Sequence, residues 1–160
     1  MKNFIKKSIV GVLVATLGTL ALAVEKSDAD DAIAFVKKAV NHIKMHGSEK
    51  SFVEFNRTDS PFNTISEMNK KGDLYVFVMN GDGIEVAHGK NPKMQGKNLI
   101  DLRDSDGVYL QREMLKACDS KDGKGWVDYK WPNPVTKVVE QKSSYVEKFG
   151  GFCIGTGIYK

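Results

Sequence analysis

The chain has 160 residues, of which 24 are Lys or Arg and 20 are Asp or Glu, so its formal net charge is +4. Hydrophobic residues make up 41% of the sequence and charged residues 28%, which excludes both a disordered chain and a multi-span membrane protein. The length favours one globular domain. Two cysteines that stand far apart exclude a disulfide scaffold and a C-x-x-C site for zinc or haem.

The first 23 residues have the pattern of a secretory signal peptide. Three lysines precede an apolar run over residues 9–22, and an A-x-A cleavage pattern occupies residues 21–23. The apolar run is shorter than the roughly 20 residues that a bilayer span needs. We therefore expect cleavage after residue 23 and a mature domain over residues 24–160 in the periplasm. An uncleaved N-terminal anchor is the alternative.

Removal of the signal peptide changes the charge of the chain. The leader holds three lysines and no acidic residue, so 24 − 3 = 21 basic and 20 acidic residues remain, a net charge of +1. The mature sequence has no Lys/Arg cluster with interleaved aromatic residues and no further long apolar run. We therefore expect neither a nucleic-acid partner nor a membrane span in the mature chain.

The mature chain begins with a predicted helical region. Apolar residues recur at helical spacing from Asp28 to Met45, acidic residues crowd the first turn, and Gly47 follows the end. A second, shorter helix is predicted to begin at Ser48. The following polar, turn-rich segment contains a short predicted helix near residues 64–69.

From residue 74 onward the pattern is typical of strands. The apolar run over residues 74–79, the turn at 80–83 and the return strand over 84–88 predict a hairpin. A long polar connection over residues 89–106 then leads to a predicted helix over 108–118. Three further strands are predicted over residues 126–131, 142–149 and 152–159. Together these elements predict an α+β domain with a five-stranded antiparallel sheet.

Several short segments form an ordered set in this region. They are DLYVFVMNGDG at residues 73–83, AH at 87–88, GKN at 96–98, DL at 101–102, DSDG at 104–107, WVDYKWPNP at 126–134, KSSYV at 142–146 and GTGIY at 155–159. In this order and spacing they resemble the single Cache domain family, which is similar to the sensor domains of methyl-accepting chemotaxis proteins and histidine kinases. The resemblance implies a PAS-like sheet, a long N-terminal helix on one face and a small-ligand pocket on the other.

The resemblance also implies a function. It predicts non-catalytic, extracytoplasmic sensing of a small organic acid of the acetate, propionate, pyruvate or lactate type, without a cofactor, in chemotaxis or two-component signalling. Because the sequence ends at Lys160 without a signalling domain, the expected partner is a membrane chemoreceptor or a histidine kinase. A homodimer through the N-terminal helix is a further expectation. The alternative function is a non-catalytic periplasmic scaffold whose pocket is filled by its own side chains.

Lys142 is the strongest candidate for a ligand-binding residue. The resemblance places here a lysine that reaches toward the pocket, and a buried cation suits a carboxylate ligand. From its residue type alone, a solvated lysine is the simpler interpretation. Two aromatic pairs, Tyr75 with Phe77 and Tyr129 with Trp131, are each spaced two apart on a strand and so share a sheet face. They predict either a pocket wall or core packing.

Several other polar residues were weighed as site residues. His88 is expected either to bind the ligand or to cap the adjoining loop. Gln111 is a candidate to cover the pocket from its helix, but its expected position is the surface. His42 and His46 have a metal-compatible i, i+4 spacing but no third ligand, so no metal site is predicted. Residues 104–113 resemble part of an EF-hand loop whose first ligand position is not acidic, which favours a simple turn.

The sequence contains two cysteines whose state is open, and it has no recognisable catalytic motif. Cys118 and Cys153 would meet an oxidising compartment after export, and both a disulfide and two buried free thiols are compatible with the sequence. The sequence contains no Ser-His-Asp signature, no G-x-S-x-G motif and no Gly-rich phosphate loop. We therefore predict no catalytic residues.

Overall fold

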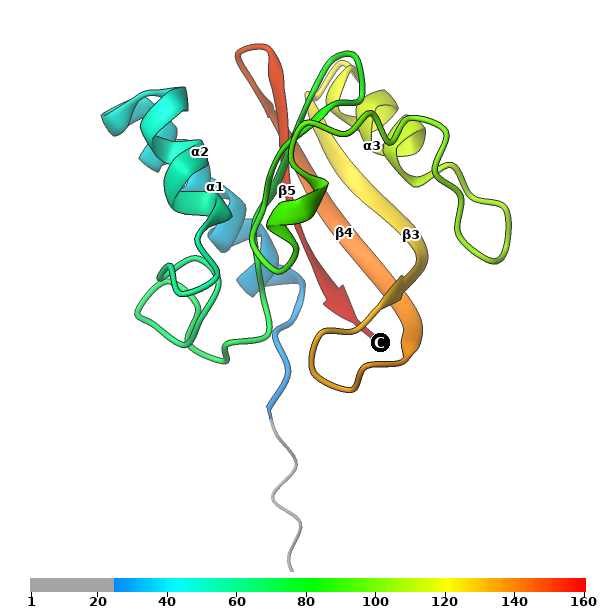
Figure 1. Cartoon of the computed structure of the whole chain (residues 1–160), viewed down its shortest axis with the longest axis horizontal. Coiled ribbons are helices and arrows are strands. Elements are labelled where there is room, and N and C mark those ends of the chain that lie inside the picture. Colours follow the sequence, from blue (N-terminus) through cyan, green and yellow to red (C-terminus); the bar gives the residue numbers. More distant parts are fainter. Residues whose placement is uncertain (1–24) are drawn as a thin grey trace, which may run out of the picture.

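The computed structural model describes residues 25–160. The predicted signal peptide over residues 1–23 lies outside the described residues. The described part contains three α-helices and one five-stranded sheet, and the helices cover both faces of the sheet (Figure 1). The prediction of an α+β, PAS-like domain is therefore confirmed. None of the helices within residues 25–160 is long and apolar enough to cross a membrane.

The first face of the sheet is covered by α1 (Ala29–His46) and α2 (Ser48–Asn56). Asp28 starts α1 with a capping box: its side chain accepts the N–H of Asp31, and the Asp31 side chain accepts the N–H of Asp28. Gly47 ends α1 with a φ of 80°, a conformation that favours glycine. Because the apolar stripe of α1 packs on the sheet, a homodimer through this helix would use its polar outer face, and such a dimer stays a prediction.

The sheet is antiparallel throughout, with the strand order β2-β1-β5-β4-β3. Its strands are β1 (Phe77–Asn80), β2 (Glu85–His88), β3 (Lys124–Pro132), β4 (Val139–Phe149) and β5 (Phe152–Tyr159). The connection between β2 and β3 contains a 3₁₀ turn, η1 (Pro92–Met94), and the helix α3 (Leu110–Cys118), which packs on the second face. The last strand in the sequence, β5, is therefore the middle strand of the sheet (Figure 1).

Two sequence-based predictions were wrong in the segment before β1. Residues 64–69 form turns and bends instead of a helix, and residues 74–76 lie outside the sheet. Asn63 and Asn69 use their side-chain amides to bind the backbone of Leu74 and Val76. The segment before β1 is thus buried, and side chains satisfy much of its backbone in place of a neighbouring strand.

The sheet separates two clusters of buried side chains. The first lies between the sheet and the helices α1 and α2, and we call it the helix-side core. Its buried members are Phe35, Val36, Ala39, Val40, Ile43, Phe55, Phe62, Leu74, Val76, Val78, Ala87, Tyr145 and Ile154. The second lies between the sheet and α3, and we call it the pocket-side core. Its buried members are Tyr75, Phe77, Met79, Leu110, Met114, Cys118, Val127, Tyr129, Val146 and Cys153.

A disulfide closes the pocket-side core. Cys118 at the end of α3 is bonded to Cys153 in β5, with a Cα–Cα distance of 5.9 Å. This bond decides between the two states that the sequence left open for these cysteines. It fixes the C-terminal end of α3 to the central strand of the sheet.

Candidate ligand-binding site

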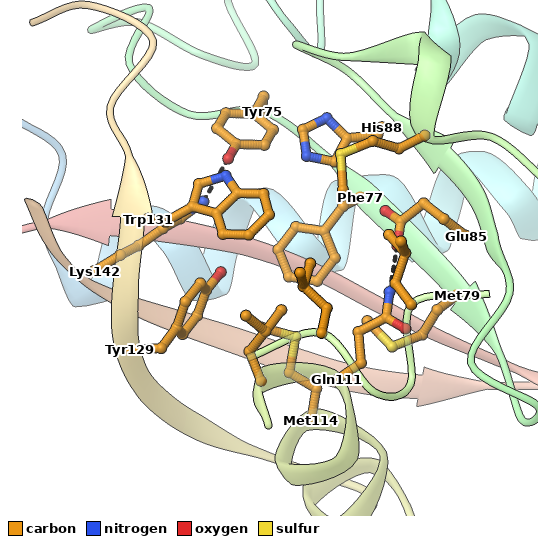
Figure 2. Close-up of a pocket in the computed structure, with 14 residues that line it drawn as sticks. Tyr75, Phe77, Met79, Glu85, His88, Gln111, Met114, Tyr129, Trp131 and Lys142 are labelled. Atoms are coloured by element: carbon orange, nitrogen blue, oxygen red, sulfur yellow. Dashed lines mark hydrogen bonds between the residues drawn. The ribbon is translucent and has the colours of Figure 1, made fainter. Parts of the chain in front are cut away.

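A small cavity lies in the pocket-side core, between the sheet, α3 and the loop over residues 89–106 (Figure 2). Its water-accessible space is about 20 Å³, room for about one water molecule. The side chains around it come from all three structural parts. They are Tyr75, Phe77, Met79, Glu85, His88, Met94, Leu99, Leu102, Leu110, Gln111, Met114, Tyr129, Trp131 and Lys142. All six side chains predicted from the sequence are therefore brought together around one cavity, and their role in ligand binding stays a prediction.

Strand alternation explains how the aromatic side chains reach the cavity. Tyr75 and Phe77 belong to the pocket-side core, whereas Val76 and Val78 between and after them belong to the helix-side core. On β3, Tyr129 is buried, and Trp131 is half-buried with its ring centroid 6.1 Å from that of Tyr129. The same aromatic side chains therefore line the cavity and pack in the pocket-side core.

Lys142 enters the cavity from β4 and is 1% exposed. Its Nζ donates a hydrogen bond of 2.6 Å to the Tyr75 hydroxyl and lies 4.2 Å from the centroid of the Tyr75 ring. The rings of Tyr159, Phe77 and Tyr129 surround the same ammonium at 5.1, 5.8 and 6.0 Å. None of the ion pairs within residues 25–160 includes Lys142. Burial lowers the pKa of Lys142 to about 7.

Gly157 on the neighbouring strand β5 makes room for the stem of this lysine. A Cβ atom at position 157 would overlap the Cε of Lys142 and the Oγ of Ser144. Ser144 itself shares a hydrogen bond of 2.9 Å with the Tyr129 hydroxyl, which fixes that ring at the cavity wall. The backbone of β5 therefore determines the path by which the ammonium reaches the cavity.

His88 both lines the cavity and holds the adjoining loop. Its Nδ1 accepts the backbone N–H of Asn91 at 3.0 Å, and its ring centroid is 5.0 Å from that of Tyr75. Burial and the nearby Lys142 charge lower the pKa of His88 to about 3, so the ring is neutral near pH 7. Since Nδ1 is the acceptor, the proton of the neutral ring resides on Nε2. The two roles that the sequence suggested for His88, ligand contact and loop cap, are compatible in this geometry.

A second polar pair lies at the cavity, Glu85 and Gln111, which are each 2% exposed. Sequence reasoning missed Glu85, and it considered a pocket position for Gln111 but favoured the surface. Gln111 Nε2 donates a hydrogen bond of 2.7 Å to Glu85 Oε2. Burial raises the pKa of Glu85 to about 8, although the Gln111 hydrogen bond and the charge of Lys142 oppose the rise. The expectation that Gln111 lies at the surface was wrong. Its spacing of three and seven residues from Met114 and Cys118, a helical stripe, was the signal that could have identified it.

A β-bulge explains why Glu85 gave no such signal. Glu85 and His88 stand three residues apart, so they would point to opposite faces of a regular strand. The register of β1 with β2 shifts between Val78 and Met79, and this places Glu85 opposite Met79 and His88 opposite Phe77. Both polar side chains therefore face α3.

The loop over residues 89–106 folds back along β2 and covers the cavity. The N–H of Gly96 donates to the carbonyl of Glu85 at 2.7 Å, and the N–H of Glu85 donates to the carbonyl of Lys97 at 2.9 Å. This pairing carries the side chains of Met94 and Leu99 over the cavity mouth. The length of this loop thus allows it to reach back over the cavity.

The residues considered as metal ligands take part in other contacts. His42 shares a hydrogen bond of 2.9 Å with the Ser51 hydroxyl and is half-buried. The Asp104 carboxylate accepts the backbone N–H groups of Asp106, Val108 and Lys130, as a turn residue does. No group of three or more metal-ligating side chains occurs within residues 25–160.

This fold and its enclosed, lysine-bearing pocket define the class of PAS-like sensory domains. The family model described as the Cache domain matches residues 24–160, and the chain belongs to this family. Cache domains are extracytoplasmic sensor domains, and the relatives of this chain are sensor proteins of chemotaxis and two-component signalling.

Two curated relatives and one solved structure show the extent of the similarity. The methyl-accepting chemotaxis protein McpP of Pseudomonas putida is 36% identical over 89 residues, which are 54% of this chain and 16% of the relative. The sensor histidine kinase MctS of Rhizobium johnstonii is 34% identical over 89 residues, 54% of this chain and 19% of the relative. The chain thus spans less than a fifth of the length of these two relatives.

The solved structure is that of a Cache chemosensory domain that recognises a carboxylic acid. It superposes with a TM-score of 0.63 at 23% identity and covers 81% of this chain and 91% of the other. At this identity the similarity establishes the shared fold.

Proposed function

We propose that this domain senses a small organic acid outside the cytoplasm and that Lys142 binds the acid's carboxylate. The observation that carries the proposal is the ammonium of Lys142, which is buried without a carboxylate partner in the described part of the chain. A buried charge is costly unless it is paired, and a carboxylate ligand would supply the pairing charge. Recognition of a carboxylic acid by the structurally similar Cache domain supports this ligand class.

The cavity offers a complete binding arrangement for a short acid. Lys142 and the Nε2–H of His88 are donors for the two carboxylate oxygens, and Tyr75 positions the ammonium. The rings of Phe77, Tyr129 and Trp131 would enclose the carbon chain. We accordingly retain all six predicted residues as the proposed ligand-binding set.

Entry of the acid requires movement of the loop that covers the cavity. Space for about one water molecule is too small for a two-carbon acid, so residues 89–106 and their side chains must shift when the ligand binds. We propose that this shift changes the outer surface of the loop and that a membrane chemoreceptor or histidine kinase detects the change. Crosslinking from a loop position in membranes, with and without the acid, tests this step. A receptor crosslink of equal yield in both conditions contradicts it.

We infer that the domain binds without catalysing a reaction. The one histidine at the cavity has a pKa of about 3 and is therefore a poor general acid or base near neutral pH. Lys142 donates to a tyrosine hydroxyl, and no carboxylate contacts it within residues 25–160. Recovery of an unchanged acid after long incubation with the protein is the expected result, and chemical conversion would contradict the inference.

We further propose export to the periplasm by cleavage after residue 23. The disulfide between Cys118 and Cys153 supports an oxidising compartment. N-terminal sequencing of the exported protein is expected to begin at Val24. Any other first residue would contradict cleavage at this site.

The small free volume favours one alternative, a periplasmic scaffold whose pocket is filled. The two functions differ in a thermal unfolding experiment with two- to four-carbon carboxylates, amino acids and amines. A sensor present with ligand at about one hundred times its Kd gains about 2.7 kcal/mol of unfolding free energy, a rise in Tm of several degrees. A scaffold shows no rise with any compound.

Two variants assign the binding to the proposed site. Lys142→Met is expected to abolish the rise in Tm, whereas Lys116→Met, on the exposed side of α3, is the matched control and keeps it. A rise that survives in Lys142→Met would retain the sensor function and reject Lys142 as the anchor.

A further inference from the structure

A second polar region of the cavity is not explained by binding of a carboxylate at Lys142. The Oε1 atoms of Glu85 and Gln111 are both buried, and neither has a hydrogen-bond partner within residues 25–160. In Figure 2 the two side chains lie on the opposite side of the cavity from Lys142. The cavity therefore has one end rich in donors and one end with two free acceptors.

The two acceptors cannot satisfy each other. The amide nitrogen of Gln111 is already directed at Oε2 of Glu85, which leaves the amide oxygen and Oε1 of Glu85 facing elsewhere (Figure 2). A buried acceptor without a donor loses its hydration without compensation, so each of these atoms favours a ligand or a water molecule that can donate.

Glu85 and Lys142 come from strands that are not neighbours in the sheet. Glu85 lies on β2 and Lys142 on β4, and the strands β1 and β5 lie between them. Three strand spacings separate the two backbones, about 14 Å. The side chains that line the space between the two ends include Phe77, Leu110 and Met114, which are apolar.

We propose that the ligand is a short hydroxy acid whose hydroxyl group lies at the end remote from the carboxylate. This inference rests on the carboxylate site proposed at Lys142. The carboxylate pairs with Lys142, the carbon chain crosses the apolar middle, and the hydroxyl binds Glu85 and Gln111. An unsubstituted acid would leave both Oε1 atoms without a hydrogen-bond partner.

A hydroxyl fits this end better than an ammonium group does. A hydroxyl donates one hydrogen bond and accepts others, so it can donate to the Gln111 carbonyl while it accepts from Glu85 Oε1, which becomes a donor instead of an acceptor when the carboxyl is protonated. An ammonium only donates and requires Glu85 to be ionised. The raised pKa of Glu85, about 8, makes the protonated carboxyl the main form near pH 7 and therefore favours the hydroxyl.

Calorimetric titration with matched pairs of acids tests the proposal. The pairs are propionate with 3-hydroxypropionate and butyrate with 4-hydroxybutyrate. In the unmodified protein at least one hydroxy acid is expected to bind about tenfold more tightly than its partner. In the double variant Glu85→Met, Gln111→Met this preference is expected to fall below about twofold. Glu85→Gln, which conserves the shape, provides a second test should the double variant not fold.

The outcomes separate this inference from the proposed function. Equal affinities within each pair, with both acids bound, overturn the hydroxyl inference and leave the carboxylate sensor intact. The same holds if a crystal structure with propionate shows a water molecule bound to both acceptors and the hydroxy acid has no advantage. A preference that persists in the double variant overturns the assignment to Glu85 and Gln111. Failure of every acid to bind overturns both proposals.

Discussion

The two faces of the sheet bury side chains of different kinds. The helix-side core consists of apolar residues that interlock between the sheet, α1 and α2. The pocket-side core has apolar residues too, but it also surrounds an ammonium, a carboxyl, an imidazole and an amide at Lys142, Glu85, His88 and Gln111. The first face gains stability from burial, whereas the second spends part of that stability to keep polar groups out of water.

From this difference we expect stability to depend mainly on the helix-side face and binding on the pocket-side face. Residues that alternate along one strand serve both faces, so β1 stabilises the fold through Val76 and Val78 and lines the cavity through Tyr75 and Phe77. Substitutions on the two faces should therefore separate stability from binding. The following four experiments test that separation.

The largest effect is expected from the helix-side core. Phe35 is 1% exposed and packs edge-to-face on Phe62 with ring centroids 5.9 Å apart. Phe35→Ala is expected to lower the free energy of unfolding by about 3–5 kcal/mol, because it removes apolar contacts and leaves a cavity. Urea unfolding measures the loss, and titration of the folded variant should show unchanged ligand preference. A changed preference would mean that the two faces are coupled.

The next largest effect on stability is expected from the disulfide, whose two cysteines both belong to the pocket-side core. Cys118 and Cys153 are separated by 35 residues, so replacing both by Ala is expected to cost roughly 3–4 kcal/mol. Urea unfolding of the variant measures this cost. Hydrogen exchange should show that α3 loses protection before α1 does. Equal loss of protection in both helices would contradict a local role.

Lys142→Met is expected to stabilise the ligand-free protein by about 1–4 kcal/mol at pH 7 or below, since it replaces a buried charge by an apolar side chain. The folded-state pKa of Lys142 is about 7 and the ordinary value is 10.5, so the unfolded chain binds the proton more tightly. The stability of the unmodified protein therefore rises, through this group, between those two pH values. The advantage of the variant should shrink across the same range, as measured by urea unfolding at several pH values. If the difference in unfolding free energy between the variant and the unmodified protein stays constant over this pH range, the pKa of Lys142 is not lowered in the folded protein.

The smallest effect concerns the pH dependence of binding. A carboxylate needs the protonated form of Lys142, and the free protein loses this proton above about pH 7. Affinity for a short acid is therefore expected to fall by up to about tenfold per pH unit above that value. Calorimetry in two buffers of different ionisation enthalpy should detect proton uptake on binding near pH 8. Absence of uptake, with binding retained, would mean that Lys142 is not the anchor.

The sequence predicted the structure best where the spacing of the residues matched the period of a single helix or strand. The helical spacing from Asp28 to Met45 predicted α1 within about one residue at each end, and the two-residue spacing of Tyr75 and Phe77 predicted their common face. Lys142 was identified through the family resemblance, since nothing in its own neighbourhood distinguishes a buried lysine from a solvated one.

The remaining parts depended on contacts that no local pattern records. Glu85 reaches the cavity because a bulge breaks the alternation of the β1–β2 hairpin. Residues 74–76 stay outside the sheet because asparagine side chains from an earlier loop bind their backbone. The pairing of Cys118 with Cys153 required the distance between α3 and β5, which is a property of the whole fold.

The close approach of Gly157 to the stem of Lys142 has a consequence for how such a site evolves. Any side chain larger than hydrogen at position 157 would push the lysine from its path, although this glycine is not among the residues that line the cavity. Under the proposed role of Lys142, a single substitution at position 157 would therefore weaken ligand binding or change ligand preference while every lining residue is kept. For this reason a ligand should not be transferred between homologous domains that share the lining but differ at this position.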